Sequence, residues 1–325
     1  MTDTPPADTP RAARPPRQPQ VKKIRREVSG WIVLDKPIGM TSTHAVSVVK
    51  RLFNAKKAGH AGTLDPLASG LLPLAFGEAT KTVPFVMDGE KAYIFTVKWG
   101  EETDSDDSDG QVIKTSPLRP TQGAIEDLLP TFLGEVSQVP PKYSALKIDG
   151  ERAYDLARDG EEVHLDARIV VIKSLKLVES DEGSATFAAE CGKGTYVRAI
   201  ARDMGRKLGC LGHVTALRRT RVGPFSEEIA ITVEDLREAG EDGPESAALA
   251  DCLMPVETAL ADLPEVRVAR HEAQRLMNGQ AIIMRGRDAP VNLGVVYVTE
   301  GGRLIALCEA EKGQLLPKRA FHLPG

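Results

Sequence analysis

The chain has 325 residues, enough for about two domains, and its 42% apolar and 27% charged residues are typical of a globular protein. No run of about 18 apolar residues could span a bilayer, and the first residues lack the apolar segment of a secretory signal. Four cysteines form neither a C-x-x-C pair nor a zinc-ligand spacing. We therefore expect a cytoplasmic protein with reduced, mostly buried thiols, no metal and no membrane partner.

The formal net charge of −4 hides a segregation of charge along the chain. Residues 191–221 carry eight Lys and Arg residues against Asp203 alone, whereas 224–265 carry twelve acidic residues against one arginine, and 101–109 carry six acidic residues. A basic block of this kind is a candidate for phosphate contact. Acidic blocks are most often solvated faces, and we interpret both in that way.

The first third of the chain predicts a disordered arm followed by a strand, a helix and a second strand. Residues 1–27 contain six prolines and a basic cluster, a composition too polar to fold by itself. An apolar strand is expected over 31–34. Apolar residues at helical spacing then predict a helix that ends near Phe53, with Ser42 or Thr43 as its N-cap. Alternation over 93–99 predicts a strand that is packed on one face, with Tyr93 toward the core or a site.

The rest of the chain predicts an α+β domain and a second, smaller domain. Helices are expected over 121–132 and 195–209, the latter with its arginines pointing away from the core, and strands over 168–178 and 185–191. Between them, 139–160 indicates an exposed loop and a short helix. The composition changes near Pro264, beyond which short apolar runs predict a β-rich module. We therefore divide the chain into an arm (1–27), a main domain (28–263) and a C-terminal domain (264–325).

One short stretch has an unusual charge pattern. Residues 58–81, AGHAGTLDPLASGLLPLAFGEATK, hold a single charged residue, Asp65, in their first twenty positions. Asp before Pro is a typical start of a helix, here over PLASGLL. The same carboxylate at a helix N-terminus could be a nucleophile, since that position favours its ionised form. The surrounding glycines permit a close approach of a ligand.

A buried carboxylate needs a partner. Arg198, in CGKGTYVRAIARD, could place its guanidinium on Asp65, and the alternative is an exposed helix arginine. The GKG in this stretch suggests a phosphate loop, but no complete nucleotide-binding pattern is present, so support for a nucleotide cofactor is weak.

Five motifs then occur in the order seen in the TruB family of pseudouridine synthases, which the chain resembles from about residue 29 to 265. They are LDKPIGMTS (34–42), GHAGTLDPLASGLLPLAFGEATK (59–81), KAYIFTVKWG (91–100), PPKYSALKIDGERAYDLAR (140–158) and GTYVRAIARDMGRKLG (194–209). GTLDPLASG is the most specific of them. Other pseudouridine synthase families typically carry an arginine where this chain has Thr63.

The resemblance implies a pseudouridine synthase fold, with a mixed, largely antiparallel sheet and flanking helices, and a small β-rich PUA-like C-terminal domain. It also implies isomerisation of the T-loop uridine (position 55) of tRNA to pseudouridine, without metal or organic cofactor. By motif position Asp65 is the nucleophile and Arg198 its partner. The positions that meet the base or the RNA are His60, Tyr93, Tyr196 and Leu217.

These residue types suit that chemistry. A carboxylate can stabilise the ribosyl cation that develops when the glycosidic bond breaks. Tyr93 could stack on the flipped base and take a proton, although a core tyrosine is the alternative. His60 would contact the loop that the base leaves, or only hydrogen-bond its own turn, and Tyr196 would flank the base or begin a helix. Lys147 and the basic block would hold phosphates.

The resemblance further implies a monomer that binds the T arm of tRNA and needs neither guide RNA nor a protein partner. Two alternatives remain at this point: a guide-RNA-dependent synthase like the archaeal and eukaryotic relatives, and a non-catalytic RNA-binding protein that keeps the basic faces.

Overall fold

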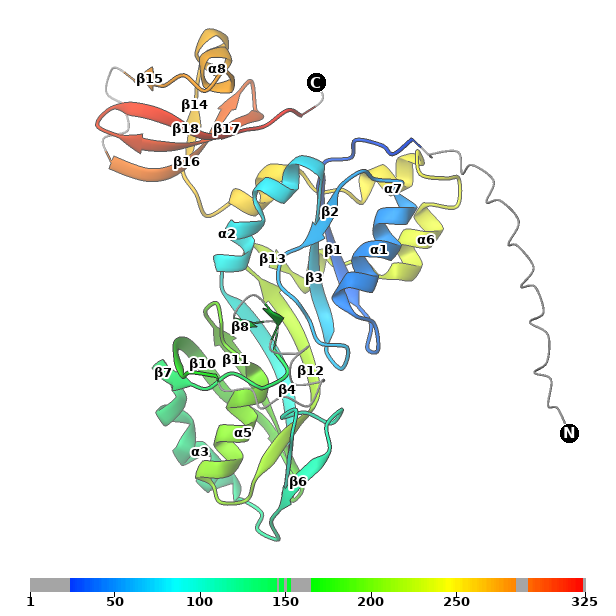
Figure 1. The fold of residues 1–325 in the computed structure, drawn as a ribbon, viewed down its shortest axis with the longest axis vertical. Helices are drawn as coiled ribbons and strands as arrows, with labels where there is room; N and C mark the ends of the chain where they lie inside the picture. The colour runs from blue at the N-terminus through cyan, green and yellow to red at the C-terminus, as the bar shows by residue number, and fades with distance from the viewer. Residues whose placement is uncertain (1–23, 145, 149–150, 153–164, 285–291, 324–325) are drawn as a thin grey trace, which may run out of the picture.

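The computed structural model describes residues 24–144, 146–148, 151–152, 165–284 and 292–323. Figure 1 shows an elongated molecule, with a long sheet and its helices at one end and a small β-rich unit at the other. Most of the predicted arm lies outside the described residues. The described end of the arm is hydrogen-bonded to the main domain. The backbone N–H of Arg26 donates to the carbonyl of Asn54, and the carbonyl of Arg26 accepts the N–H of Lys56.

A nine-stranded sheet forms the centre of the main domain. Its strands are β1 (Gly30–Lys36), β2 (Ala58–His60), β3 (Ser69–Phe76), β4 (Lys91–Trp99), β7 (Gly134–Gln138), β10 (Arg168–Ser180), β11 (Ser184–Cys191), β12 (Gly212–Val222) and β13 (Phe225–Ser226). The main path runs β1-β3-β12-β4-β11-β10-β7, with β2 on β3 and β13 on β12. β3 and β12 run parallel, and the other pairs are antiparallel. The predicted mixed, largely antiparallel sheet is confirmed.

Short helices flank this sheet (Figure 1). They are α1 (Ser42–Leu52), α2 (Val83–Asp88), α3 (Gln122–Leu128), α5 (Val197–Lys207), α6 (Val233–Ala239) and α7 (Ala247–Asp251), with 3-10 turns η1 (Gly77–Lys81), η2 (Leu129–Phe132), η3 (Glu227–Ile229) and η4 (Val256–Leu260). Two hairpins lie outside the nine-stranded sheet. One joins β5 (Glu101–Thr103) to β6 (Val112–Thr115), and the other joins β8 (Lys147–Ile148) to β9 (Glu151–Arg152). The N-cap of α1 is Thr41, one residue before the predicted positions, because its side chain accepts the N–H of His44.

The helix expected after Asp65 was a wrong prediction. The backbone N–H of Ala68 donates to the carbonyl of Asp65 at 3.1 Å, which closes a turn, and β3 begins at Ser69. Gly70 has a φ of +95°, and a Cβ there would lie 2.2 Å from the carbonyl oxygen of Arg219 on β12. The close parallel pairing of β3 with β12 therefore overrides the local helix signal.

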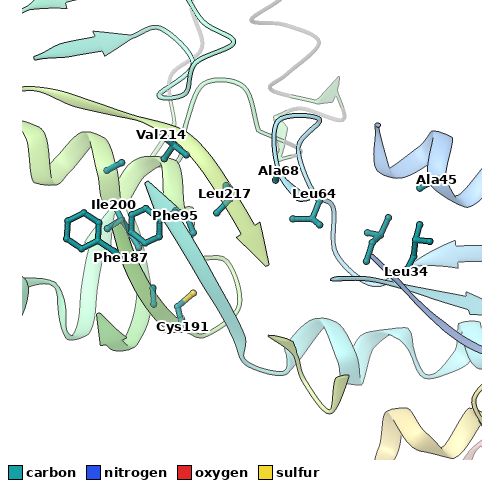
Figure 2. Close-up of a cluster of buried hydrophobic side chains, with 14 of the residues drawn as sticks. Leu34, Ala45, Leu64, Ala68, Phe95, Phe187, Cys191, Ile200, Val214 and Leu217 are labelled. Carbon is teal, nitrogen blue, oxygen red and sulfur yellow. The ribbon is translucent and has the colours of Figure 1, made fainter. Parts of the chain in front are cut away.

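The main hydrophobic core continues beneath the turn that carries Asp65. Figure 2 shows this cluster running from Phe95 and Phe187, whose rings stack at 5.4 Å, through Leu64 and Ala68 to Leu34 and Ala45. Leu64 and Ala68 are both buried and stand on either side of Asp65. Their burial fixes the turn by its two ends and leaves the carboxylate at the surface of the core.

The C-terminal residues form a five-stranded sheet with one helix, which confirms the predicted β-rich second part. Its elements are β14 (Glu265–Arg267), α8 (Arg270–Met277), β15 (Ile282–Ile283), β16 (Asn292–Glu300), β17 (Arg303–Glu311) and β18 (Gln314–Ala320), in the sheet order β14-β16-β17-β18-β15. Phe321 is fully buried in one cluster with Trp31 of β1 and Leu304 of β17. The two sheets therefore share a hydrophobic interior.

None of the described helices combines the length and the apolar character that a membrane crossing needs.

Candidate active site

Three polar contacts hold the backbone on both sides of Asp65. Ser42, at the start of α1, accepts the N–H of Leu64 and donates to its carbonyl, both at 2.9 Å. The N–H of Gly39 donates to the carbonyl of Pro66 at 2.8 Å. The two segments on either side of the Asp65 carboxylate are thus fixed, while its side chain keeps 37% of its surface accessible.

Arg198 of α5 contacts this carboxylate. Its Nη2 lies 3.0 Å from Oδ2 of Asp65, and its Nη1 lies 3.2 Å from Oδ2 of Asp107. The same guanidinium donates to the carbonyls of Ser105 at 3.0 Å and Tyr143 at 2.8 Å. The contact expected from the sequence is present, and the alternative of an exposed helix arginine was wrong. A planar guanidinium with this many acceptors has a fixed orientation.

Opposing effects act on the charge of Asp65. Burial raises the pKa of the Asp65 carboxyl above its ordinary value, and the Asp107 carboxylate raises this pKa further. The Arg198 guanidinium lowers it. Lys36, also buried, lowers it further, and burial brings the pKa of Lys36 itself down to about 8. Asp65 is therefore a stronger base than a solvated aspartate, and the two cations favour its ionised form.

A cavity of about 410 Å³ opens beside the carboxylate, and five of the predicted site residues line it. These are Asp65, Tyr93, Tyr196, Arg198 and Leu217. They come from the β2–β3 turn, β4, the start of α5 and β12, so residues more than 150 positions apart in the sequence meet in one space.

The two tyrosines are held in different ways. Tyr93 of β4 faces Arg219 of β12 in register. Burial raises the pKa of the Tyr93 phenol, while its hydrogen bond to Arg219 and the charge of Arg219 act in the opposite direction. Tyr196 is the N-cap of α5, and its backbone is clamped by Gln138, whose amide accepts its N–H at 2.9 Å and donates to its carbonyl at 3.2 Å.

Of the other two predicted residues, His60 lies away from the described lining of this cavity and the side chain of Lys147 is not described. His60 is half-buried in β2 opposite Leu74, and it is not among the described residues that line the cavity. Lys147 stands in β8 opposite Arg152, and its side chain lies outside the described part of the chain. The short helix expected before residue 160 also falls on residues outside the described ranges.

Three ion pairs between α5 and buried carboxylates were missed from the sequence. We call them the α5 ladder: Arg198 with Asp107 at 3.2 Å, Arg202 with Asp106 at 2.9 Å, and Arg206 with Glu102 at 2.7 Å. All three carboxylates are buried. The prediction of a solvated acidic face over 101–109 was therefore wrong for these residues. The prediction that the α5 arginines point away from the core was wrong for Arg198 and Arg202, which are buried, whereas Arg206 is exposed. Their spacing of four residues on one helix was the available signal.

The basic block over 191–221 is mostly used inside the fold. The α5 ladder takes three of its arginines. Beyond it, Arg218 pairs with Asp35 at 2.9 Å and Arg221 with Glu190 at 3.2 Å. All eight basic residues of the block have a partner within the chain. Lys193, Arg206 and Lys207 of the block nevertheless stay exposed, and phosphate contact by the block stays a prediction.

Within the described ranges, no group of three or more His, Cys, Asp or Glu side chains is placed to hold a metal ion.

Comparison with known proteins identifies the family. The model of the TruB family pseudouridylate synthase N-terminal domain matches residues 50–197, that of the tRNA pseudouridylate synthase B C-terminal domain matches 198–261, and that of the pseudouridine synthase II TruB C-terminal region matches 264–321. The tRNA pseudouridine synthase B of Rhodopseudomonas palustris is 63% identical over 310 residues, which cover 94% of this chain and 84% of the relative. The chain belongs to the TruB family.

Other TruB relatives and solved structures agree with this assignment. The tRNA pseudouridine synthase B of Rhizobium meliloti is 54% identical, with 94% of this chain and 98% of the relative covered. The fold also matches a Cbf5-Nop10-Gar1 complex with a TM-score of 0.69, at 26% identity over 90% of this chain and 85% of the matched chain. As a TruB member, the chain is a pseudouridine synthase.

Proposed function

We propose that this enzyme isomerises the T-loop uridine at position 55 of tRNA to pseudouridine, with Asp65 as the nucleophile. The observation that carries the proposal is the Asp65 carboxylate, held at 3.0 Å by Arg198 on the wall of a cavity of about 410 Å³. The names of the relatives, which share 52–63% identity with it, support tRNA as the substrate.

The reaction breaks the bond from ribose C1′ to N1 of uracil and forms a bond from C1′ to C5. The hydrogen on C5 leaves as a proton and N1 gains one, so atoms balance without a co-reactant. A carboxylate beside C1′ stabilises the developing positive charge, as the nucleophile of a retaining glycosidase does. Asp65 can perform this step only when ionised, which gives Arg198 its function.

The cavity has the size and lining that a flipped pyrimidine needs. Unstacking the base costs a few kcal/mol, and stacking on an aromatic face recovers about 1–3 kcal/mol. Tyr93 supplies that face, while Tyr196 and Leu217 line the remaining wall. In this proposal His60 and Lys147 contact the RNA outside the cavity. Bound RNA would close this cavity and keep water from the detached sugar.

The test is tritium release from a tRNA transcript that carries 5-tritiated uridine, with the purified protein alone. We expect wild-type enzyme to release tritium from position 55 and Asp65→Asn to release none, while both bind the transcript with similar affinity. Asp262→Asn, which removes an exposed carboxylate between the two sheets, is the matched control and should behave as wild type.

Each alternative predicts a different outcome of this experiment. If the wild type binds the transcript but releases nothing under any condition, the protein is an RNA-binding protein rather than a stand-alone catalyst. If release begins only when a guide RNA is added, the enzyme works in the guide-dependent manner. The proposal also specifies a monomer, which sedimentation of the active enzyme would check.

A further inference from the structure

Arg219 of β12 differs from the other arginines near the site. It is 2% exposed and lines the cavity together with Asp65 and Tyr93. Among the described residues, no ion pair joins its guanidinium to a carboxylate. Burying an arginine in this way costs free energy that the fold must offset elsewhere. This free-energy cost points to a function of Arg219 beyond the stability of the sheet.

The guanidinium of Arg219 binds the backbone on both sides of the nucleophile. Its Nε donates to the carbonyl of Leu71 at 2.8 Å, just after the turn, and its Nη2 donates to the carbonyl of Gly62 at 3.1 Å, just before it. A longer contact of 3.4 Å joins Nη1 to the carbonyl of Thr63. One side chain thus ties the entry and the exit of the Asp65 turn to β12.

The backbone that accepts from Arg219 is itself in a conformation that favours glycine. Gly62 has a φ of +98°, which disfavours any other residue, and Nη1 of Arg219 lies 3.4 Å from where a Cβ would stand, an ordinary contact distance. One of the glycines around Asp65 is therefore explained by the turn that presents its carbonyl to Arg219.

The same guanidinium also reaches the other wall of the cavity. Arg219 and Tyr93 are cross-strand partners between β12 and β4, and both line the cavity. The positive charge of Arg219 opposes the increase in the Tyr93 pKa that burial causes. Arg219 thus joins the backbone of the nucleophile turn to the strand position that carries the aromatic platform.

We propose that Arg219 is a positioning residue for catalysis, which sets the distance between the Asp65 carboxylate and the ring of Tyr93. This inference rests on the proposed function, because it assumes that the base is stacked on Tyr93 while Asp65 approaches C1′. Both groups must be aligned at once, and a misplacement of about 1 Å can cost about 100-fold in rate. Arg219 is 2% exposed, so we expect it to contribute little to RNA affinity.

The test compares two variants, R219K and R219Q, with wild type. Lysine keeps the charge but can no longer hold Leu71 and Gly62 with a planar fork, and glutamine keeps donors without the charge. For both we expect kcat to fall by about tenfold to 100-fold, with the KM for tRNA and the equilibrium affinity within about twofold of wild type. Circular dichroism and thermal melting establish that each variant is folded.

Arg218 provides the matched control on the same strand. Its side chain points to the opposite face of β12, where it pairs with Asp35 and Glu227 rather than with any group of the cavity. R218K should therefore leave kcat unchanged.

Three results would overturn the inference. An inactive wild type is not one of them, because it would instead contradict the proposed function. The first is a kcat of R219K and R219Q equal to that of wild type. The second is a raised KM or a weaker affinity for tRNA with an unchanged kcat, because it would make Arg219 an RNA contact. Unfolding of both variants is the third, because it would assign Arg219 to the stability of the sheet.

Discussion

Helix α5 and strand β12 approach the same carboxylate from two sides, and they use arginine differently. Arg198 of α5 binds two carboxylates, Asp65 and Asp107, so its charge is neutralised where it lies. Arg219 of β12 donates instead to backbone carbonyls on both sides of Asp65. The comparison separates two requirements of one nucleophile: an ion pair sets its charge, and hydrogen bonds to its backbone set its position.

The largest effect should come from breaking the ion pair. Arg198→Met should lower the single-turnover rate of tritium release by about 100-fold or more, because it removes both charge and orientation from Asp65. Arg198 lowers the pKa of Asp65, so its loss raises that pKa further. Because activity needs the carboxylate and is lost as pH falls through this pKa, the acid limb of the rate profile should move to higher pH.

Arg202→Met is the control for this shift, since Arg202 lies one turn further along α5 and pairs with Asp106 instead. An acid limb that stays in place in Arg198→Met would contradict the assignment of charge control to α5.

Substitution of Asp107 should lower the rate less than that of Arg198 and should shift the acid limb of the pH profile in the opposite direction. Its negative charge raises the pKa of Asp65, so Asp107→Asn should lower that pKa and move the acid limb to lower pH. The rate should also fall, by about tenfold, because Arg198 loses one of its anchors. The pH profile distinguishes the two causes. A shift in the same direction as in Arg198→Met would show that Asp107 acts only by holding the arginine.

The smallest effect on catalysis is expected at the far end of the α5 ladder. Glu102→Gln should leave kcat unchanged but lower the free energy of unfolding by about 1–3 kcal/mol, as hydrogen bonds to a charged group are lost. Arg206 lowers the pKa of Glu102 below its ordinary 4.5. This contribution is therefore complete above pH 4.5 and is lost as pH falls through the lower folded-state value.

Urea unfolding of wild type and Glu102→Gln at several pH values measures this difference. The two unfolding free energies should converge at acid pH, and a difference that persists there would mean that the pair contributes through packing rather than charge.

Local patterns in the sequence predicted much of the fold. The alternation in β4, the apolar face of α5 and the apolar runs of the C-terminal part all correspond to observed elements. The start of β3 could not be predicted in this way. Asp65-Pro66 is a local helix signal, whereas the pairing of Gly70 with Arg219 joins segments about 150 residues apart. Non-local pairing of this kind leaves no periodic trace in a single sequence.

The candidate site shows the same limit. The contact between Arg198 and Asp65 could be anticipated from motif resemblance, and the role of that contact in catalysis stays a prediction. The acidic run over 101–109 looked solvated because its arginine partners lie about 90–105 residues away. Arg219 was counted only as part of a basic block, since nothing in its local sequence distinguishes it from Arg218.

The cluster that Trp31 shares with Phe321 has a consequence for how the protein is made. β1 is synthesised long before β17, yet Leu304 and Phe321 belong to the apolar interior on one of its sides. A nascent chain that stalls before β17 therefore lacks part of this interior and exposes apolar surface of the first sheet to solvent and to chaperones.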